Sequence, residues 1–396
     1  VILVGLFAKR PTPVLALTMY AGVCDVLWRS SSAHGPYEGS KYAVIFGCTC
    51  LAVRFVKRPR HLASMGTLVL LLLPGAVIGI MKLGVANARD NVVFNLAGLI
   101  AIAVAVIGCG SLRLTSREMR GLYLVVIGPI VSMATLATIS TASAASLTFS
   151  ADSNLTTSGG FGPNQVSAVL CLGGLLCVLV TLQRHVGWTL RVFALVTGIW
   201  LVSQAILTFS RGGLFELVLA LGCLAVTALT LSGHRARTLM AAAVLLVIAI
   251  QILSWAGAFT GGASSKRLSS TDTTQRGEIA AADVRLFLKH PVMGVGLGVS
   301  KSARGVGPGE PPHTEYTRLL AEHGVAGVFV MVILAWVSIE LVRAGRGWYR
   351  MATVALVVIA LAQMAHNATR IGSIAVAFGL AALLEASEAH ERRPSP

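Results

Sequence analysis

The sequence predicts an all-α protein, a polytopic integral membrane helical bundle of about twelve transmembrane helices with one large outer loop that carries short helices. Two observations lead to this prediction. Hydrophobic residues make up 55% of the 396 positions and charged residues only 12%, about half of the ~25% that is usual in soluble domains. The mean hydropathy is +0.78. A soluble enzyme, a disordered tail and a disulfide-rich secreted module are therefore excluded.

Twelve apolar segments are candidate transmembrane helices. They are 11–28, 41–56, 62–82, 91–110, 120–141, 163–183, 188–208, 213–231, 236–256, 324–343, 348–366 and 371–388. The chain thus divides into three parts. Residues 1–256 contain the first nine spans, residues 257–323 form the large outer loop with surface helices, and residues 324–396 contain the last three spans and a cytoplasmic tail.

Basic residues cluster in every second connecting segment, and positive charge in short loops marks the cytoplasmic side of a membrane protein. The basic segments contain Lys9, Arg10, Arg54, Lys57, Arg58, Arg60, Arg113, Arg117, Arg120, Arg184, Arg191, Arg235, Arg237, Arg343, Arg346, Arg350, Arg392 and Arg393. Both termini are therefore expected in the cytoplasm and loop 257–323 outside. The net charge of +16 is spread over short groups, so it indicates membrane orientation and no nucleic-acid partner.

The outer loop 257–323 is expected to contain two short helices. The first runs from Arg276 to His290 and ends at Pro291, and the second begins at about Thr314 and leads into the tenth span. The apolar face of the first helix is expected to hold Ile279, Val284, Phe287 and Leu288.

The sequence predicts no metal site and no other cofactor. All seven cysteines lie in apolar segments, where cysteine is typically a small hydrophobic residue. No Asp-x-Asp pair occurs, and carboxylates are sparse in the outer segments. Asp25, near the middle of the first span, has no obvious partner.

Arg211 closes the seventh span, at the outer side. One interpretation is an anchor whose charged head reaches the membrane interface. The other is a clamp for phosphate, because a guanidinium binds two phosphate oxygens at once and Gly212-Gly213 would let a headgroup approach the backbone. Arg276, which opens the first surface helix, is either a solvated residue or a second member of this clamp.

His313 lies at the start of the second surface helix, after two prolines. Such a histidine is often a capping or surface residue, but an imidazole on the outer side can also accept a proton near neutral pH. Glu315 and Arg318 lie on the same helix. His366 and Arg370, at the outer end of the eleventh span, are either interface anchors or supporting residues of the same site.

Four segments, taken in order, resemble the O-antigen ligase and O-antigen polymerase superfamily of bacterial polytopic membrane glycosyltransferases. They are FGPNQVSAVL (161–170), TFSRGG (208–213), the run from Arg276 through LKHPVMGVGLG (288–298), and HTEYTRLLAEHGVAG (313–327). The resemblance covers roughly residues 160–330. Thr314 stands where the family often has asparagine.

The resemblance implies transfer of a glycan from an undecaprenyl-diphosphate carrier to an acceptor hydroxyl, of the lipid A-core type, at the periplasmic face of the inner membrane. It implies that Arg211 and Arg276 bind the diphosphate, that His313 is catalytic, and that no metal takes part. Attack in line with the departing diphosphate would invert the anomeric configuration. The partners are then the lipid-linked donor, the acceptor and membrane lipids.

Several alternatives stay open on the sequence. A ligase is favoured because one large outer loop contains the histidine and the other, residues 142–162, has no Lys or Arg. An O-antigen or exopolysaccharide polymerase and a protein O-oligosaccharyltransferase of the same family are alternatives. A secondary transporter, a lipid-linked-sugar flippase or a structural scaffold would belong to other classes.

Overall fold

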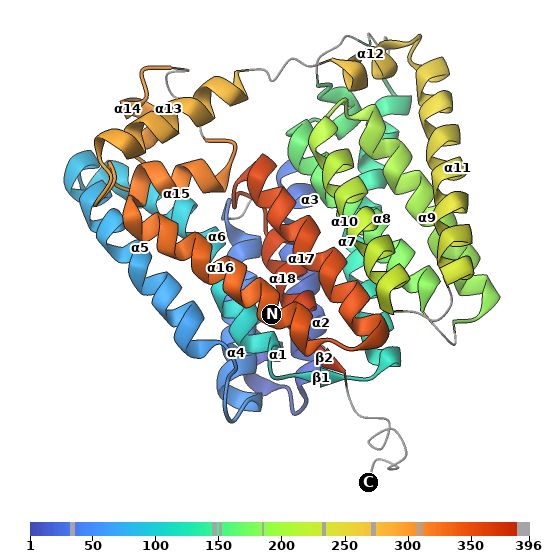
Figure 1. The fold of residues 1–396 in the computed structure, drawn as a ribbon, viewed down its shortest axis with the longest axis horizontal. Helices are drawn as coiled ribbons and strands as arrows, with labels where there is room; N and C mark the ends of the chain where they lie inside the picture. The colour runs from blue at the N-terminus through green and yellow to red at the C-terminus, as the bar shows by residue number, and fades with distance from the viewer. Residues whose placement is uncertain are drawn as a thin grey trace.

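The computed structural model describes residues 1–31, 36–144, 149, 153–183, 186–231, 235–270, 275–306, 310 and 312–385, with the side chains of 88–90 and 235–238 left out. It is an all-α bundle (Figure 1), which confirms the predicted class. Part of loop 142–162, Arg184, the end of segment 371–388 and the basic tail with Arg392 and Arg393 lie outside the described residues.

Nine helices of the described chain are long and apolar enough to cross a membrane. They are α5 (Leu62–Leu83), α6 (Val85–Cys109), α7 (Ser116–Ala142), α8 (Pro163–Leu182), α9 (Trp188–Leu207), α10 (Arg211–Leu231), α11 (Arg235–Phe259), α16 (Val325–Ala344) and α17 (Gly347–Asn367). Each coincides with a predicted span, because a long apolar run is a local property of the sequence.

The other three predicted spans are shorter helices. The first is divided at Cys24 into α2 (Pro11–Val23) and α3 (Asp25–Ser30), the second is α4 (Gly39–Phe55), and the twelfth is α18 (Ser373–Ala382). The ten residues of α18 rise only ~15 Å, about half of the hydrocarbon thickness of a bilayer. The number of membrane crossings therefore stays a prediction.

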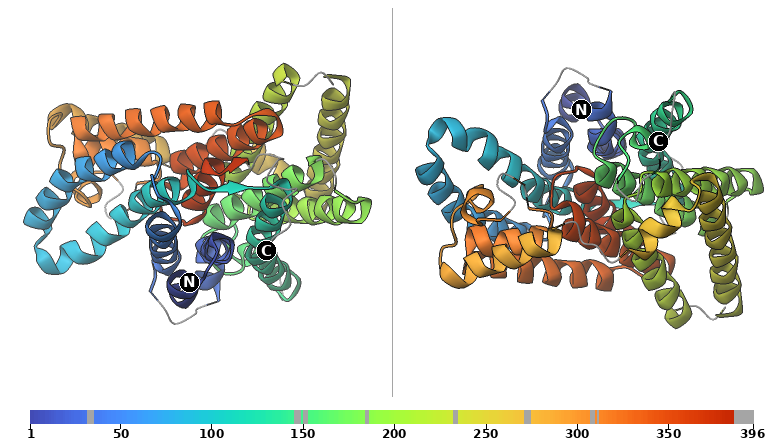
Figure 2. Two further views of the ribbon diagram at one scale, coloured as in Figure 1. Left: turned by 90° about the horizontal axis from the view of Figure 1, so that it is seen from below. Right: turned by 90° about the horizontal axis from the view of Figure 1, so that it is seen from above.

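The centre of the bundle is formed by α17 and α18, drawn in red in Figure 1 and seen from both ends in Figure 2. Every residue of α18 is buried, and the helix packs against α17, α6 and α2. Close packing here depends on small residues. A Cβ on Gly98 of α6, for example, would lie 2.3 Å from the carbonyl oxygen of Thr369.

The short elements gather at the two ends of the bundle. The helices α12 (Ala263–Ser269), α13 (Arg276–Lys289) and α14 (Ser300–Ala303) lie at the end drawn uppermost in Figure 1. The parallel strands β1 (Arg113–Leu114) and β2 (Leu384–Glu385) lie at the other end. The remaining short helices are α1 (Ile2–Phe7), η1 (Thr156–Ser158) and α15 (Glu315–His323).

The predicted surface helices are present as α13 and α15, and the predicted apolar face of α13 is right only in part, because Ile279 is buried whereas Val284 is 37% exposed. The buried residues of α13 are Ile279, Ala282, Asp283 and Leu286, a spacing of three, four and seven that follows the helical period. Leu288 is 69% exposed. The helix packs on α15, and there the Thr317 hydroxyl donates to Asp283 Oδ2 at 3.3 Å.

Candidate functional site

Arg211 begins α10 directly after a tight turn. Phe209 has a positive φ of 58°, and its carbonyl accepts a hydrogen bond from Arg267 Nε at 3.2 Å. The Ser210 hydroxyl donates to Asn164 Oδ1 of α8 at 2.8 Å. The Arg211 guanidinium donates to the carbonyl of Ser270, just beyond α12. The turn therefore places Arg211 at the upper end of the bundle, beside α12.

Backbone strain gathers around the candidate arginines. Among the described residues, Phe209, Gln275 and Ala368 are three of the four non-glycine residues with positive φ. Each lies within two residues of an arginine of the predicted set. Positive φ is unfavourable for residues with a side chain and often accompanies functional sites.

A cavity of about 420 Å³ brings four of the predicted residues together. Its lining contains Arg211 and Arg276, the predicted phosphate clamp, together with His313 and His366. Arg267 is a further arginine of this lining, and no Asp or Glu is among the described residues that line it. The other lining residues are Asn164, Gly212, Phe215, Gly277, Ala280, Thr314 and Ala365.

The three arginines repel one another. The pKa of Arg276 is lowered, first by burial and then by the positive charges of Arg267 and Arg211. Arg267 is itself only 8% exposed. Like charges held together in a partly buried place are unfavourable unless an anion joins them. A cavity with this lining favours a negatively charged group.

His366 occupies the space beside Gly212. A Cβ on Gly212 would lie 1.8 Å from the imidazole Cε1, and a Cβ on Gly213 would lie 2.4 Å from the Ser167 hydroxyl. Gly212 also lines the cavity, so the expectation that these glycines let a headgroup approach the backbone stays a prediction. They make room for the His366 ring and for close packing of α10 on α8.

Residues 368–370, directly after α17, contact the segment that leads into α15 and the first residue of that helix. Ala368 N–H donates to the His313 carbonyl at 3.0 Å, and Thr369 N–H donates to Glu315 Oε2 at 3.2 Å. The Arg370 guanidinium donates to the carbonyl of Pro312. We call residues 368–370 the clasp. The clasp holds the backbone carbonyl groups of Pro312 and His313. Arg370 therefore takes part in the site by holding the backbone next to His313.

His313 is surrounded by positive charge. Burial lowers its pKa to about 3, and the neighbouring guanidinium groups of Arg370 and Arg276 act in the same direction. The imidazole is therefore neutral at physiological pH and has a lone pair to accept a proton.

Glu315 and Arg318 do not line the cavity. Arg318 is 1% exposed; its Nε donates to Glu315 Oε2 at 3.0 Å and its Nη1 to Glu322 Oε2 at 2.9 Å. A buried charge satisfied in this way supports the fold. We interpret the two residues as the support behind His313.

Three charged residues of this region, Glu216, Arg267 and Arg29, have no counterpart in the sequence prediction. Arg267 and Glu216 belong to no recognisable motif. Asp25, expected to be without a partner, lies 3.0 Å from Arg29 and accepts a hydrogen bond from Gly372 N–H at 3.0 Å. Arg29 also donates to the Arg370 carbonyl at 3.4 Å, so it is connected to the clasp.

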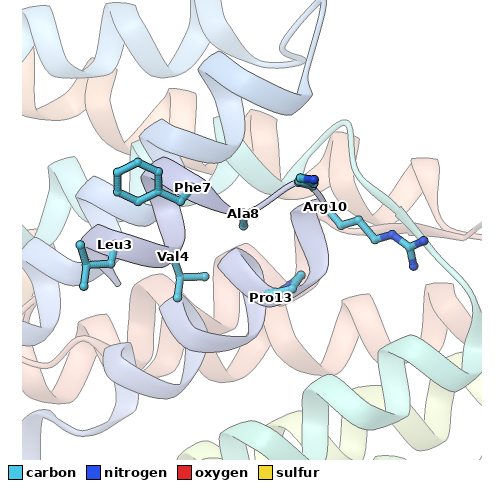
Figure 3. A pocket seen from close by; sticks show the side chains of 7 residues that line it. Leu3, Val4, Phe7, Ala8, Arg10 and Pro13 are labelled. Atoms are coloured by element: carbon cyan, nitrogen blue, oxygen red, sulfur yellow. The ribbon is translucent and has the colours of Figure 1, made fainter.

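A second hollow of about 630 Å³ lies beside α1, at the lower end of the bundle (Figure 3). Its lining is Leu3, Val4, Phe7, Ala8, Lys9, Arg10 and Pro13. This mostly apolar lining offers no imidazole or carboxylate for chemistry. Within the described part of the chain, no three His, Cys, Asp or Glu side chains are grouped so as to hold a metal ion.

Residues 196–332 match the family model described as O-antigen ligase. The matched segment includes His313 and the three arginines of the cavity, Arg211, Arg267 and Arg276. The resemblance found in the sequence is thereby confirmed, and it indicates a ligase- or polymerase-like membrane glycosyltransferase in general. No curated protein matches the chain.

Proposed function

We propose, with the O-antigen ligase match as the premise, that this protein moves a glycan from an undecaprenyl-diphosphate carrier to a hydroxyl of a lipid A-core acceptor. The observation that carries the proposal is the cavity in which three arginines and two histidines meet without a carboxylate in the described lining. Such a site suits a diphosphate, whose oxygens match the guanidinium fork.

The arginines act on the leaving group. As the bond between the anomeric carbon and the diphosphate oxygen breaks, its electron pair leaves with the diphosphate. Arg211, Arg267 and Arg276 stabilise this charge from fixed positions in a partly buried site, where electrostatic stabilisation is strongest. The proposed reaction therefore needs no metal ion.

His313 acts on the acceptor. The acceptor oxygen forms a bond to the anomeric carbon while its proton passes to the neutral imidazole. The negative diphosphate offsets the charges of Arg276 and Arg370, which lower the pKa of His313 in the empty cavity. Donor binding thus makes His313 a stronger base. Attack opposite the leaving group inverts the anomeric configuration.

The proposed location is the inner membrane, with both termini cytoplasmic and the cavity at the periplasmic face. Support comes from the basic segments, since β1 with Arg113 and the helices α12 and α13 lie at opposite ends of the bundle (Figure 1). Cysteine labelling in intact cells checks this: position 305 should react from outside and position 235 only after permeabilisation.

The experiment that tests the function is transfer by the purified protein in nanodiscs, with an undecaprenyl-diphosphate-linked glycan and a lipid A-core acceptor. Glycosylated acceptor, formed equally in EDTA, is the expected product. Product only when a second lipid-linked repeat is the acceptor would identify a polymerase, and product on Ser or Thr of a protein would identify a protein-directed enzyme. Movement of donor across the membrane without transfer would reject the proposal.

A further inference from the structure

His366 connects a buried carboxylate with an arginine of the cavity. Its Nε2 lies 2.6 Å from Arg276 Nη1, and its Nδ1 lies 3.4 Å from Glu216 Oε1. A guanidinium can only donate hydrogen bonds, so Nε2 must accept. In the neutral ring the proton is then on Nδ1, on the side of Glu216. The Asn367 amide nitrogen Nδ2 lies 3.3 Å from Nδ1. Because Nδ1 carries the proton, we assign this amide the flipped orientation, in which its oxygen accepts.

The residues around the His366 imidazole fit the orientation in which Nδ1 faces Glu216 and Nε2 faces Arg276. Gly212 and Glu216 are one turn apart on α10, so they share a face of that helix. The missing side chain of Gly212 leaves the space that the imidazole fills, and Glu216, 2% exposed, lies behind it. A buried carboxylate needs a partner, and the imidazole Nδ1, 3.4 Å from Glu216 Oε1, is within ion-pair distance of it.

An imidazole suits this place better than a carboxylate would. A carboxylate against Arg276 would bind two of its N–H groups and cancel its charge. It would then compete with the phosphate oxygens of a ligand. A neutral imidazole accepts one N–H and leaves the other donors and the whole positive charge available.

We infer that Glu216 and His366 form a positioning pair that orients the Arg276 guanidinium toward the diphosphate while leaving its charge intact. This inference rests on the proposed function, and it assigns to two residues of the spanning helices α10 and α17 a role in donor binding. Neither touches the reacting atoms in this account. Both act through Arg276.

A double-mutant cycle tests the inference, because residues that act through a shared partner have non-additive effects. The variants are His366→Leu, Arg276→Ala and the double variant. His366→Leu should raise the donor KM and weaken binding of undecaprenyl diphosphate about tenfold, as expected for one hydrogen bond to a charged group. Its kcat should change little. In the Arg276→Ala background the same change should have almost no further effect.

Conservative variants separate positioning from packing. His366→Gln should retain most of the affinity, since its amide oxygen can accept from Arg276. Glu216→Gln should resemble the wild type, and Glu216→Leu should resemble His366→Leu. Should His366→Leu fail to fold, Glu216→Leu takes its place in the cycle. Equal losses in both Arg276 backgrounds, or a fall in kcat with an unchanged donor KM, would overturn the inference.

The outcomes also distinguish this inference from the proposed function. If the wild-type protein neither binds undecaprenyl diphosphate nor transfers glycan, the proposed function fails and the inference with it. If the wild type binds and the cycle is additive, the inference alone is wrong. Competition by inorganic diphosphate shows that the headgroup, rather than the lipid chain, is what Arg276 recognises.

Discussion

Two groups of arginines at this end of the molecule have opposite surroundings. Behind α15, Arg318 is paired with both Glu315 and Glu322. In the cavity, Arg211, Arg267 and Arg276 stand together with no carboxylate in the described lining. The two carboxylates make Arg318 part of the support of the fold, whereas the cavity arginines line a space that a ligand can enter. The carboxylates around an arginine, more than its residue type, thus separate support from the proposed function.

His313 lies between the two groups, and its replacement should have the largest effect. A general base contributes ~10²–10⁴-fold, so His313→Ala should lower kcat by that factor with donor binding nearly unchanged. His313→Gln should be almost as poor, since an amide cannot take the proton. Transfer assays with donor titration measure both quantities. Substantial activity in His313→Gln would mean that the residue only positions the acceptor, and a collapse of donor binding would place it in the phosphate clamp.

Replacing Arg318, the paired arginine, should destabilise the fold. Arg318→Leu leaves Glu315 and Glu322 buried without their partner, and breaking a buried ion pair in this way costs ~3–5 kcal/mol. The matched control is Arg276→Leu, which removes a like charge from its neighbours and should not lower stability. The temperature of thermal aggregation in detergent compares the two variants. Similar values would contradict the distinction between the groups.

Variants of the cavity arginines should lose affinity for the donor. One charge-assisted contact is worth ~1.5–3 kcal/mol, so Arg211→Ala and Arg276→Ala should each reduce kcat/KM for the donor about ten- to a hundredfold. Lysine should restore only part, since an ammonium cannot form the bidentate fork. Wild-type rates in both alanine variants, measured by initial velocity at low donor concentration, would show that these residues are interface anchors.

The smallest effect concerns pH. The pKa of His313 is lowered to about 3 in the empty cavity, so the neutral base persists above that pH and is lost as the pH falls through it. The acid limb of kcat/KM, which reports the free enzyme, should therefore lie below that of kcat, because bound diphosphate raises the pKa. Profiles of both constants down to the limit of protein stability check this order. Coinciding limbs would argue against electrostatic coupling between donor and base.

The sequence predicted what depends on local pattern. Apolar runs and helix signals predicted the nine long helices together with α13 and α15. The basic segments predicted that Arg211, Arg276, His313 and His366 lie on the same side of the membrane. Glu216 and Arg267 were missed because their roles depend on which helix face meets a distant segment. The contact of the His366 ring with Gly212 was missed for the same reason, since His366 approaches it from another helix.

The clasp bears on whether this active site can be moved between proteins. The matched segment, residues 196–332, contains His313 and the three cavity arginines, so it looks like a cassette that could be exchanged as a unit. The backbone around His313 is nevertheless held by residues 368–370, and Arg29 near the other end of the chain holds the Arg370 carbonyl. A chimaera that transplants the cassette alone would carry the reactive groups without the parts that aim them.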